Sequence, residues 1–282
     1  MKKFFAALCA IAAACVFQPL PAEAFSLGTF NIEYFAVTGQ KRYTPEDCAH
    51  LAQTIQDSRA DLLSLQEIEG DGAMTYLVAR HLPGWRFAGN DTASSQDLYF
   101  LWKDSAVQML SGPDVYFANA SFQHDGSTFR LFDRPPLVAT FKDKASGFQF
   151  TLVNVHLKSQ STRGKSDVVS AKAYNDAKRA AQLEALDRLV SSLNGPIFIT
   201  GDFNYESPKT AFRLLTLPDG LYSYDATRSS LDHIGYAGLT FSRPPALREA
   251  ESSIPRRSPG RSQHPDHDIV LLDFILAGGA KK

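Results

Sequence analysis

Apolar and polar positions follow two different periods along the chain, and together they predict a mixed α/β fold. Short apolar runs at 25–31 and 61–66 predict buried strands. Between them, Thr44-Pro45-Glu46-Asp47 is typical of a helix start, because threonine caps the first turn, proline fits inside it and acids favour the positive end of the dipole. This helix is expected to run to about Ser58.

The rest of the chain continues with short strands and a few helices. A helix is expected at 73–82, and a long one at 166–193 with Arg179 and Glu184 on its solvated side. An apolar run predicts a strand that leads into Asp202, and a short helix is expected at 209–215. Further strands are predicted at 85–88, 98–102, 107–110, 115–117, 129–132, 137–141, 148–156, 231–236 and 269–276.

Polar residues stand at the ends of many predicted strands. They are Asn31, Glu67, His156, Asp202, Asp232 and His267. Because ligands bind at the carboxyl ends of strands in open α/β sheets, this arrangement predicts one cleft. We expect two packed sheets with helices outside and the cleft at one end of the sandwich.

The stretch Ile199-Thr200-Gly201-Asp202-Phe203-Asn204 carries the densest polar signal. Gly201 lets the backbone turn tightly after the strand and present Asp202 and Asn204 together. A carboxylate accepts a proton or holds a cation, whereas a carboxamide can donate to an anionic oxygen. The alternative is an Asx-type turn that only closes the strand.

Glu67 follows a buried apolar strand, where an unpaired charge would be costly. It therefore needs a structural ion pair or a bound cation. Oxygen ligands without a histidine and cysteine cluster favour Mg²⁺, Mn²⁺ or Ca²⁺ over zinc.

Imidazoles occur beside acids in Asp232-His233 and in Asp266-His267, and alone at His156. A carboxylate orients an imidazole and raises its pKa, which suits it to proton transfer near neutral pH. The alternatives are a structural strand-end histidine and ordinary surface dipeptides.

The N-terminus has the pattern of an export signal. Lys2 and Lys3 precede an apolar stretch at 4–17, and Ala22-Glu23-Ala24 fits a cleavage site, so residues 1–24 are interpreted as a signal peptide. A lipoprotein signal cut before Cys15 is the alternative. With no second long apolar segment, we expect no membrane span, one domain over residues 25–282 and a secreted or periplasmic location.

Charge and cysteine content narrow the choice of partners. From residue 25 onward the chain has 27 basic and 29 acidic side chains, so nucleic acid would have to bind a local patch. Cys48 is the only cysteine left, which excludes an intramolecular disulfide. We interpret Cys48 as a buried apolar residue rather than a reactive thiol.

Six short motifs in a fixed order resemble the endonuclease/exonuclease/phosphatase family, and the resemblance spans residues 27 to 276. They are Phe30-Asn31-Ile32, Leu65-Gln66-Glu67, Asn154-Val155-His156-Leu157, Gly201-Asp202-Phe203-Asn204, Leu231-Asp232-His233-Ile234 and Asp266-His267. The segment 132–138 also resembles the strand that carries a substrate-contacting arginine. The resemblance implies a four-layer α/β sandwich, with two packed, mostly antiparallel β-sheets flanked by helices, and Mg²⁺-dependent phosphoester hydrolysis.

The resemblance also assigns expected roles. It makes Glu67 the main metal ligand, supported by Asn31, with Asp266 near the metal. For the chemistry it implies that Asp202 and Asn204 align the attacking water and the phosphate, and that His267, paired with Asp232, is the base or an orienting imidazole. It implies that His156 binds the scissile phosphate or protonates the leaving oxygen. Arg134 is implied to hold a phosphate oxygen.

This chain departs from the family pattern before the strand at 98–102. Where a deoxyribonuclease of the family has a tyrosine and a glutamate, this chain has Ser94 and Gln96. Because that glutamate partners the first histidine, its absence questions an acid role for His156. His233 is interpreted as structural.

Two cation-rich stretches bear on the substrate. Lys158, Arg163 and Lys165 follow His156 and are expected to contact a phosphate backbone, and the Arg243–Arg261 segment is either a second contact or a flexible loop. The prediction is a monomeric, secreted nuclease that cuts DNA with little sequence preference. Alternatives are a phosphatase, a sphingomyelinase, against which the lack of an exposed aromatic hairpin argues, or a catalytically inactive binding module.

Overall fold

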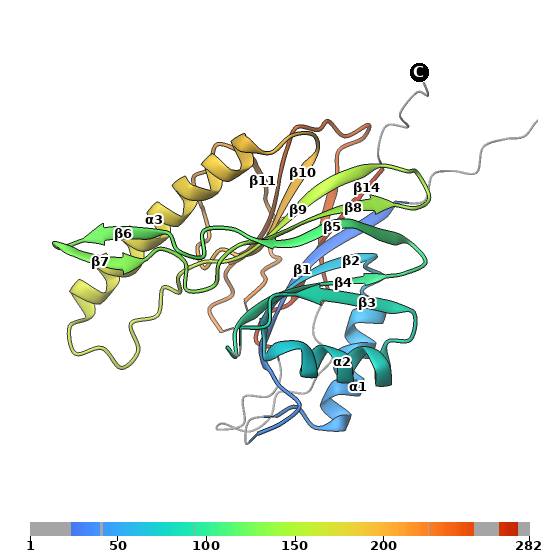
Figure 1. The fold of residues 1–282 in the computed structure, drawn as a ribbon, viewed down its shortest axis with the longest axis horizontal. Coiled ribbons are helices and arrows are strands. Elements are labelled where there is room, and N and C mark those ends of the chain that lie inside the picture. Colours follow the sequence, from blue (N-terminus) through green and yellow to red (C-terminus); the bar gives the residue numbers. More distant parts are fainter. Residues whose placement is uncertain (1–23, 40–41, 93, 225, 251–264, 276–282) are drawn as a thin grey trace, which may run out of the picture.

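The computed structural model describes residues 24–39, 42–92, 94–224, 226–250 and 265–275. Two six-stranded sheets pack face to face, with helices on both outer sides (Figure 1). The α/β sandwich expected from the sequence is therefore confirmed. The expected signal peptide lies outside the described residues, except for Ala24.

The first sheet has the order β13-β14-β1-β2-β4-β3. Its strands are β1 (Phe25–Phe35), β2 (Leu62–Ile68), β3 (Trp85–Gly89), β4 (Asp97–Lys103), β13 (Ala246–Ala250) and β14 (Ile269–Phe274). The second sheet has the order β11-β12-β10-β9-β8-β5. Its strands are β5 (Val107–Val115), β8 (Leu137–Asp143), β9 (Gln149–His156), β10 (Ile197–Asp202), β11 (Arg213–Leu215) and β12 (Asp232–Ala237).

Each sheet contains one parallel pair, β1–β2 in the first and β9–β10 in the second, and the other pairs are antiparallel. Within each parallel pair, both strands present their carboxyl ends at the same edge. Strands β12 and β14 begin at that edge because they run antiparallel to their neighbours. Asp232 therefore starts a strand and His267 lies just before one, whereas the sequence had suggested strand ends.

Three apolar clusters hold the layers together. One fills the space between the sheets and is built from alternate residues such as Leu27, Leu152 and Phe198. The second lies between the first sheet and the helices α1 (Pro45–Asp57) and α2 (Gly70–His81). The third lies between the second sheet and α3 (Val168–Ser192). The sandwich thus has four layers, with the two sheets in the middle.

The helix start predicted at Thr44 is confirmed. The Asp47 N–H donates to the Thr44 hydroxyl at 3.2 Å, and the Thr44 N–H donates to the Asp47 carboxylate at 2.7 Å, which completes a capping box. Helix α3 is capped by Asp167, which accepts from the Ser170 N–H at 2.9 Å. Cys48 is buried in α1, and burial raises the pKa of its thiol to about 12, as expected for an inert residue.

Several expectations about the elements were wrong. The short helix expected at 209–215 is absent; the chain there forms the edge strand β11, because residues 213–215 pair with β12. The strand expected at 107–110 extends to Val115 as β5, with register shifts on both sides of Ser111. Of the strand expected at 115–117, only Val115 belongs to it, and residues 116–117 lie outside any strand. Arg179 is buried rather than solvated, whereas Glu184 is exposed as expected.

A small β-hairpin was not foreseen. Strands β6 (Ser121–His124) and β7 (Ser127–Arg130) form a separate two-stranded sheet beside α3 (Figure 1). Phe122 and Phe129 of this hairpin lie against Tyr174 of α3, and Phe129 is 36% exposed. The argument that the chain lacks an exposed aromatic hairpin was therefore wrong. None of the described helices has the length and apolar character needed to cross a membrane.

Candidate active site

Strand alternation brings polar side chains of the two sheets together at one edge of the sandwich. Even-numbered residues of β9 and β10 face the first sheet, from Phe150 and Phe198 in the core to His156 and Asp202 at the edge. Just inside the edge, the buried Gln66 amide donates to the Asn154 side chain at 2.7 Å. Hydrogen-bonded polar groups thus separate the apolar core from the charged site.

Glu67 reaches this edge through a local distortion of β2. Its neighbours Leu65 and Ile68 flank a register shift, and Glu67 itself has a φ of 62°. Such a bulge re-aims the side chain. The carboxylate accepts from the Asn31 amide at 3.4 Å and from the Tyr34 N–H at 3.3 Å. Burial raises the pKa of Glu67, while the Asn31 hydrogen bond and the Arg134 charge oppose this shift.

Asp202 and Asn204 leave β10 through a tight turn. Gly201 has a φ of 147°, and a Cβ there would lie 1.9 Å from the Val155 carbonyl oxygen, so only glycine fits. One Asp202 oxygen accepts from the Asn204 N–H at 2.7 Å, which is the Asx-turn bond. The other accepts from the Asn31 amide at 3.1 Å. The turn therefore orients Asp202 without using its whole carboxylate, and burial raises the pKa of Asp202 to about 7.

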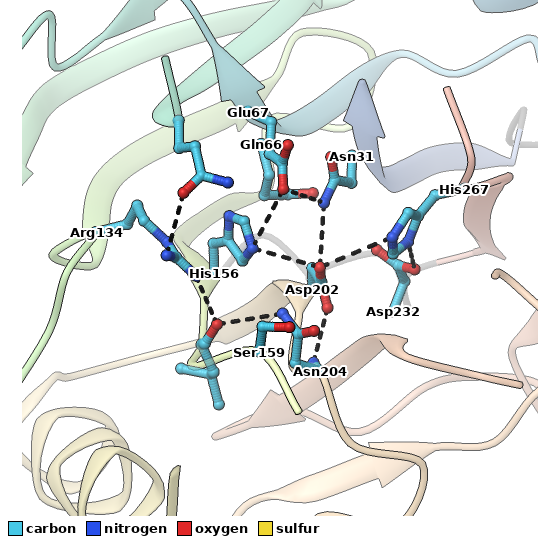
Figure 2. A network of polar contacts seen from close by, with 12 residues as sticks. Asn31, Gln66, Glu67, Arg134, His156, Ser159, Asp202, Asn204, Asp232 and His267 are labelled. Atoms are coloured by element: carbon cyan, nitrogen blue, oxygen red, sulfur yellow. Dashed lines mark hydrogen bonds and ion pairs between the residues drawn. The ribbon is translucent and has the colours of Figure 1, made fainter. Parts of the chain in front are cut away.

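His267 and Asp232 form a tight, buried pair. The Nδ1 of His267 lies 2.6 Å from Asp232 Oδ2, and its Nε2 lies 3.9 Å from Asp202 Oδ2 (Figure 2). Burial alone would lower the pKa of His267, but the Asp232 charge and hydrogen bond, together with Asp202 and Asp266, raise it to about 10. His267 therefore carries a proton near neutral pH.

His156 has different surroundings. Its Nε2 lies 3.5 Å from Asp202 and 3.7 Å from Glu67. Its Nδ1 is buried and has no hydrogen-bond partner among the described residues. Burial first, and then the positive charge of Arg134, lower the pKa of His156 well below its usual value. The suspicion that His156 lacks a carboxylate partner on its other nitrogen is thus confirmed within the described chain.

Gln96 contacts Arg134 rather than His156. The Arg134 guanidinium donates to the Gln96 side chain at 3.3 Å and to the Leu157 carbonyl at 2.7 Å. The Asn204 amide donates to the same Leu157 carbonyl at 3.2 Å. These bonds place Arg134 and Asn204 on either side of one backbone oxygen, next to His156.

A cleft of about 900 Å³ opens over these groups. It brings together most of the predicted site residues, which are Asn31, Glu67, Arg134, His156, Lys158, Asp202, Asn204, Asp266 and His267. Asp232 stands behind His267 and does not line the cleft. His233 is buried and its Nε2 donates to the Tyr205 carbonyl oxygen at 2.7 Å. It also stays outside the lining, as expected for a structural residue.

The other predicted cations do not join the cleft. Arg163 and Lys165 are exposed beyond its lining, although residues 159–162 of the same loop belong to it. Arg248 instead belongs to the edge strand β13 and pairs with Asp273 at 2.6 Å. Part of the expected flexible Arg243–Arg261 loop is therefore strand, and residues 251–264 lie outside the described residues.

Some residues that shape the cleft were missed. The Tyr224 ring lies 4.8 Å from the His267 ring. On α3, Gln182 accepts from the Lys158 N–H at 2.9 Å and donates to the Leu131 carbonyl at 2.9 Å. Arg179 donates to the Lys158 carbonyl at 2.9 Å. Polar residues three positions apart on a helix face that is otherwise apolar were the available signal.

The donors at the cleft fit a hard cation better than zinc. Among the described residues no three histidine, cysteine or acidic side chains stand close enough to form a metal cluster. Mg²⁺ needs no such cluster, because it keeps several waters and takes one or two carboxylates plus substrate oxygens. The buried Glu67 carboxylate offers this kind of oxygen, and the Asn31 amide holds it in place by donating to it at 3.4 Å, while the Asn31 Oδ1 accepts from the Glu33 N–H at 3.1 Å.

The model of the Endonuclease/Exonuclease/phosphatase family matches residues 28–279. The chain belongs to this family. Its members are phosphoester hydrolases that typically use divalent metals. No curated protein matches the sequence significantly.

Solved structures share the fold at low sequence identity. An endonuclease/exonuclease/phosphatase protein from Bacteroides vulgatus is 19% identical, with a TM-score of 0.62 over 90% of this chain and 99% of that one. A mannosyl-6-phosphatase from Bacteroides thetaiotaomicron is 15% identical, with a TM-score of 0.60 over 89% and 100% of the two chains. D. rerio TDP2 complexed with a single-strand DNA product is 15% identical, with a TM-score of 0.59 over 89% and 99%. At these identities the likeness concerns the fold alone.

Proposed function

We propose that this family member is a secreted, divalent-metal-dependent nuclease that hydrolyses DNA with little sequence preference. The observation that carries the proposal is the open cleft in which the carboxyl groups of Glu67 and Asp202, beside His267, adjoin the cations Arg134 and Lys158. A polyanionic backbone needs such donors beside the hydrolytic centre. That the similar TDP2 structure holds a single-strand DNA product is compatible with this proposal.

The chain's own residues divide the work. We assign Glu67 and Asn31 to holding Mg²⁺, with Asp266 near it; Mn²⁺ or Ca²⁺ would suit the same oxygens. The ion supplies Lewis-acid stabilisation of the charge that develops on the phosphoryl oxygens. Arg134, Asn204 and neutral His156 bind those oxygens from the other side.

The pKa pattern assigns the proton transfers. Asp202, with a pKa raised to about 7, is poised to accept a proton from the attacking water, because a base works best when its pKa lies near the operating pH. His267 stays protonated beside Asp232 and stabilises the phosphoryl group as an imidazolium. Of the two roles left open for His267, this favours orientation and charge over that of the base.

Two other functions are each supported by one specific observation. A small phosphate ester suits the family and the similar mannosyl-6-phosphatase. A lipid phosphoester is favoured by the hairpin residue Phe129, which is 36% exposed. A catalytically inactive binding module explains the 2.6 Å Asp232–His267 pair less well, because binding alone does not require a buried acid–imidazole pair.

One assay separates these possibilities. Purified protein lacking residues 1–24 is incubated with supercoiled plasmid, linear DNA, RNA, mannose 6-phosphate and sphingomyelin vesicles, each with Mg²⁺ and with EDTA. We expect EDTA-sensitive cleavage of plasmid and linear DNA to dominate. Faster turnover of sphingomyelin or mannose 6-phosphate would replace the nuclease proposal, and no turnover of any substrate would favour the binding module.

A further inference from the structure

The buried face of α3 changes from apolar to polar along its length. In the C-terminal half, residues such as Leu186 and Leu189 belong to the apolar cluster between α3 and the second sheet. At spacings of three and four residues, the same face continues toward the N-terminus with polar side chains. They are Asn175, Lys178, Arg179 and Gln182, and each is at most 5% exposed. Because burying an unpaired polar group is costly, these side chains need partners in the neighbouring segments.

Two of them hold the backbone of the 158–162 loop, which lines the cleft. Arg179 donates to the Lys158 carbonyl at 2.9 Å. Asn175 donates to the Ser161 carbonyl at 3.1 Å. Helix α3 therefore fixes one wall of the cleft from behind.

Gln182 joins this loop to the segment that precedes β8. Its Oε1 accepts from the Lys158 N–H at 2.9 Å, and its Nε2 donates to the Leu131 carbonyl at 2.9 Å. A carboxamide offers a donor and an acceptor on one planar group, so it can satisfy a backbone N–H and a carbonyl at once. One turn earlier on α3, Lys178 pairs with Asp133 at 2.6 Å. The helix is thus bonded to both segments.

The two segments also meet on the cleft side. Arg134 lies three residues after Leu131, and its guanidinium donates to the Leu157 carbonyl at 2.7 Å. Lys158 follows Leu157 directly and is bonded to Gln182. The bonds of Gln182 and Arg134 therefore close a ring through the two segments. This ring fixes the backbone of Arg134 relative to that of Lys158, and both cations line the cleft.

We propose that Gln182 is a positioning residue for phosphate binding, which holds Arg134 and Lys158 together at the cleft without contacting the substrate. Gln182 is buried and does not line the cleft, so it acts through these two residues. When its amide is removed, the ring opens and the two segments are free to shift apart. The inference rests on the proposed function, in which the two cations receive the phosphate.

The test removes both bonds of Gln182 and measures the binding of an anion. Gln182→Met keeps the length of the side chain and removes its donor and its acceptor. The control is Leu189→Ala, which opens a cavity in the apolar half of the same face. For each variant we measure the dissociation constant of sulfate by calorimetry in Mg²⁺, kcat/KM on a nitrophenyl phosphodiester, and the urea midpoint.

We expect Gln182→Met to bind sulfate about tenfold more weakly than the wild type and to lower kcat/KM by a similar factor, the scale of a lost buried hydrogen bond. Leu189→Ala should lower the urea midpoint and leave sulfate binding unchanged. Unchanged sulfate binding by Gln182→Met would overturn the proposal, as would an equal loss in Leu189→Ala or a wild type that binds no sulfate. If Gln182→Met does not fold, Gln182→Asn replaces it, because its shorter amide cannot reach both partners.

A double-mutant comparison tests whether Gln182 acts through Arg134. Gln182→Met is added to Arg134→Ala, in which the ring is already open. The added loss in kcat/KM and in sulfate binding should be less than about twofold, because changes within one hydrogen-bond network are not additive. The same fold loss with and without Arg134 would show that Gln182 only stabilises the structure.

These outcomes are separate from DNA cleavage. If plasmid is not cut but Gln182→Met binds sulfate more weakly than both the wild type and Leu189→Ala, the nuclease proposal fails and the positioning role stands. If plasmid is cut and Gln182→Met binds sulfate as the wild type does, the positioning role fails alone.

Discussion

The two histidines of the cleft sit about equally deep, yet they have opposite electrostatic surroundings. His267 is bound at Nδ1 by Asp232 at 2.6 Å, and its pKa is raised to about 10. The Nδ1 of His156 has no hydrogen-bond partner within the described chain, and burial, with the charge of Arg134 nearby, lowers the pKa of His156. Burial alone would lower both pKa values, so the position of one carboxylate decides which imidazole is charged.

This difference divides the cleft into two halves. The half around His267 and Asp232 holds a positive charge that stabilises the phosphoryl group. The half around His156, Glu67 and Arg134 binds the phosphate and the cation. The predictions below test this division.

The largest effect is expected from Glu67→Gln. This change keeps the size of the side chain and removes the charge that we assign to the metal, whose stabilisation is worth several kcal/mol, or about a thousandfold in rate. Turnover should fall by that factor or more at limiting Mg²⁺, with an unchanged circular dichroism spectrum. Glu69→Gln is the control, since Glu69 is exposed just beyond the site. Wild-type turnover of Glu67→Gln at limiting Mg²⁺ would show that the ligand assignment is wrong.

His267→Ala should lower kcat by about a thousandfold, the upper end of the loss caused by removing one donor that stabilises charge in the transition state. Asp232→Asn should reproduce much of this loss, because it removes the carboxylate that keeps the imidazole charged and oriented. The control is His233→Ala, which removes a buried imidazole that faces Tyr205 instead. If His267→Ala retained most of its activity, the positive charge that stabilises the phosphoryl group would have to come from another residue.

His156→Ala is expected to cost about a hundredfold, through lost phosphate positioning rather than proton transfer. A leaving group that needs no proton separates these roles. Rates are compared on an alkyl and a nitrophenyl phosphodiester, and the loss should be similar on both. Recovery of near-wild-type rates on the nitrophenyl ester by His156→Ala, but not by His267→Ala, would make His156 the general acid.

Removing cations near the cleft should have a smaller effect. Lys158→Ala should weaken DNA binding about tenfold and lower the salt dependence by about one unit of slope. Arg163→Ala with Lys165→Ala should change binding less, because both lie beyond the lining. Hydrolysis of a small phosphodiester serves as the control and should stay nearly intact in both variants. Equal losses on DNA and the small ester would mean that the loop shapes the catalytic centre.

The smallest effects concern stability against pH, measured as urea midpoints in EDTA. The pKa of His156 is lowered in the fold, so below about pH 6.5 the unfolded chain binds a proton that the folded chain does not, and stability falls. The pKa of His267 is raised, so its contribution is complete below about pH 6.5 and is lost as the pH rises toward 10. His156→Gln should flatten the acid side and His267→Gln the alkaline side. A flatter alkaline side in His156→Gln, or a flatter acid side in His267→Gln, would contradict the division of the cleft.

Much of this protein was determined by local sequence. The pattern of apolar residues predicted most strands of the two sheets, although not β11 and β13, and the capping box at Thr44 predicted the start of α1, because these signals act within a few residues. The order of strand-edge residues such as Glu67, His156 and Asp202 was enough to predict one shared cleft. Gln96 in the sequence also predicted that His156 lacks the glutamate partner that the family pattern provides, and its Nδ1 has no partner within the described chain.

Tertiary structure decided what depends on distant neighbours. Residues 213–215 became a strand because β12 offers a free edge, which local propensity does not reveal. Arg179 is buried and donates to the Lys158 carbonyl, and Arg248 pairs with Asp273 away from the cleft. The charge states of His156 and His267 were settled in the same way, because burial and an ion pair 35 residues away set them, and neither is encoded beside the histidine itself.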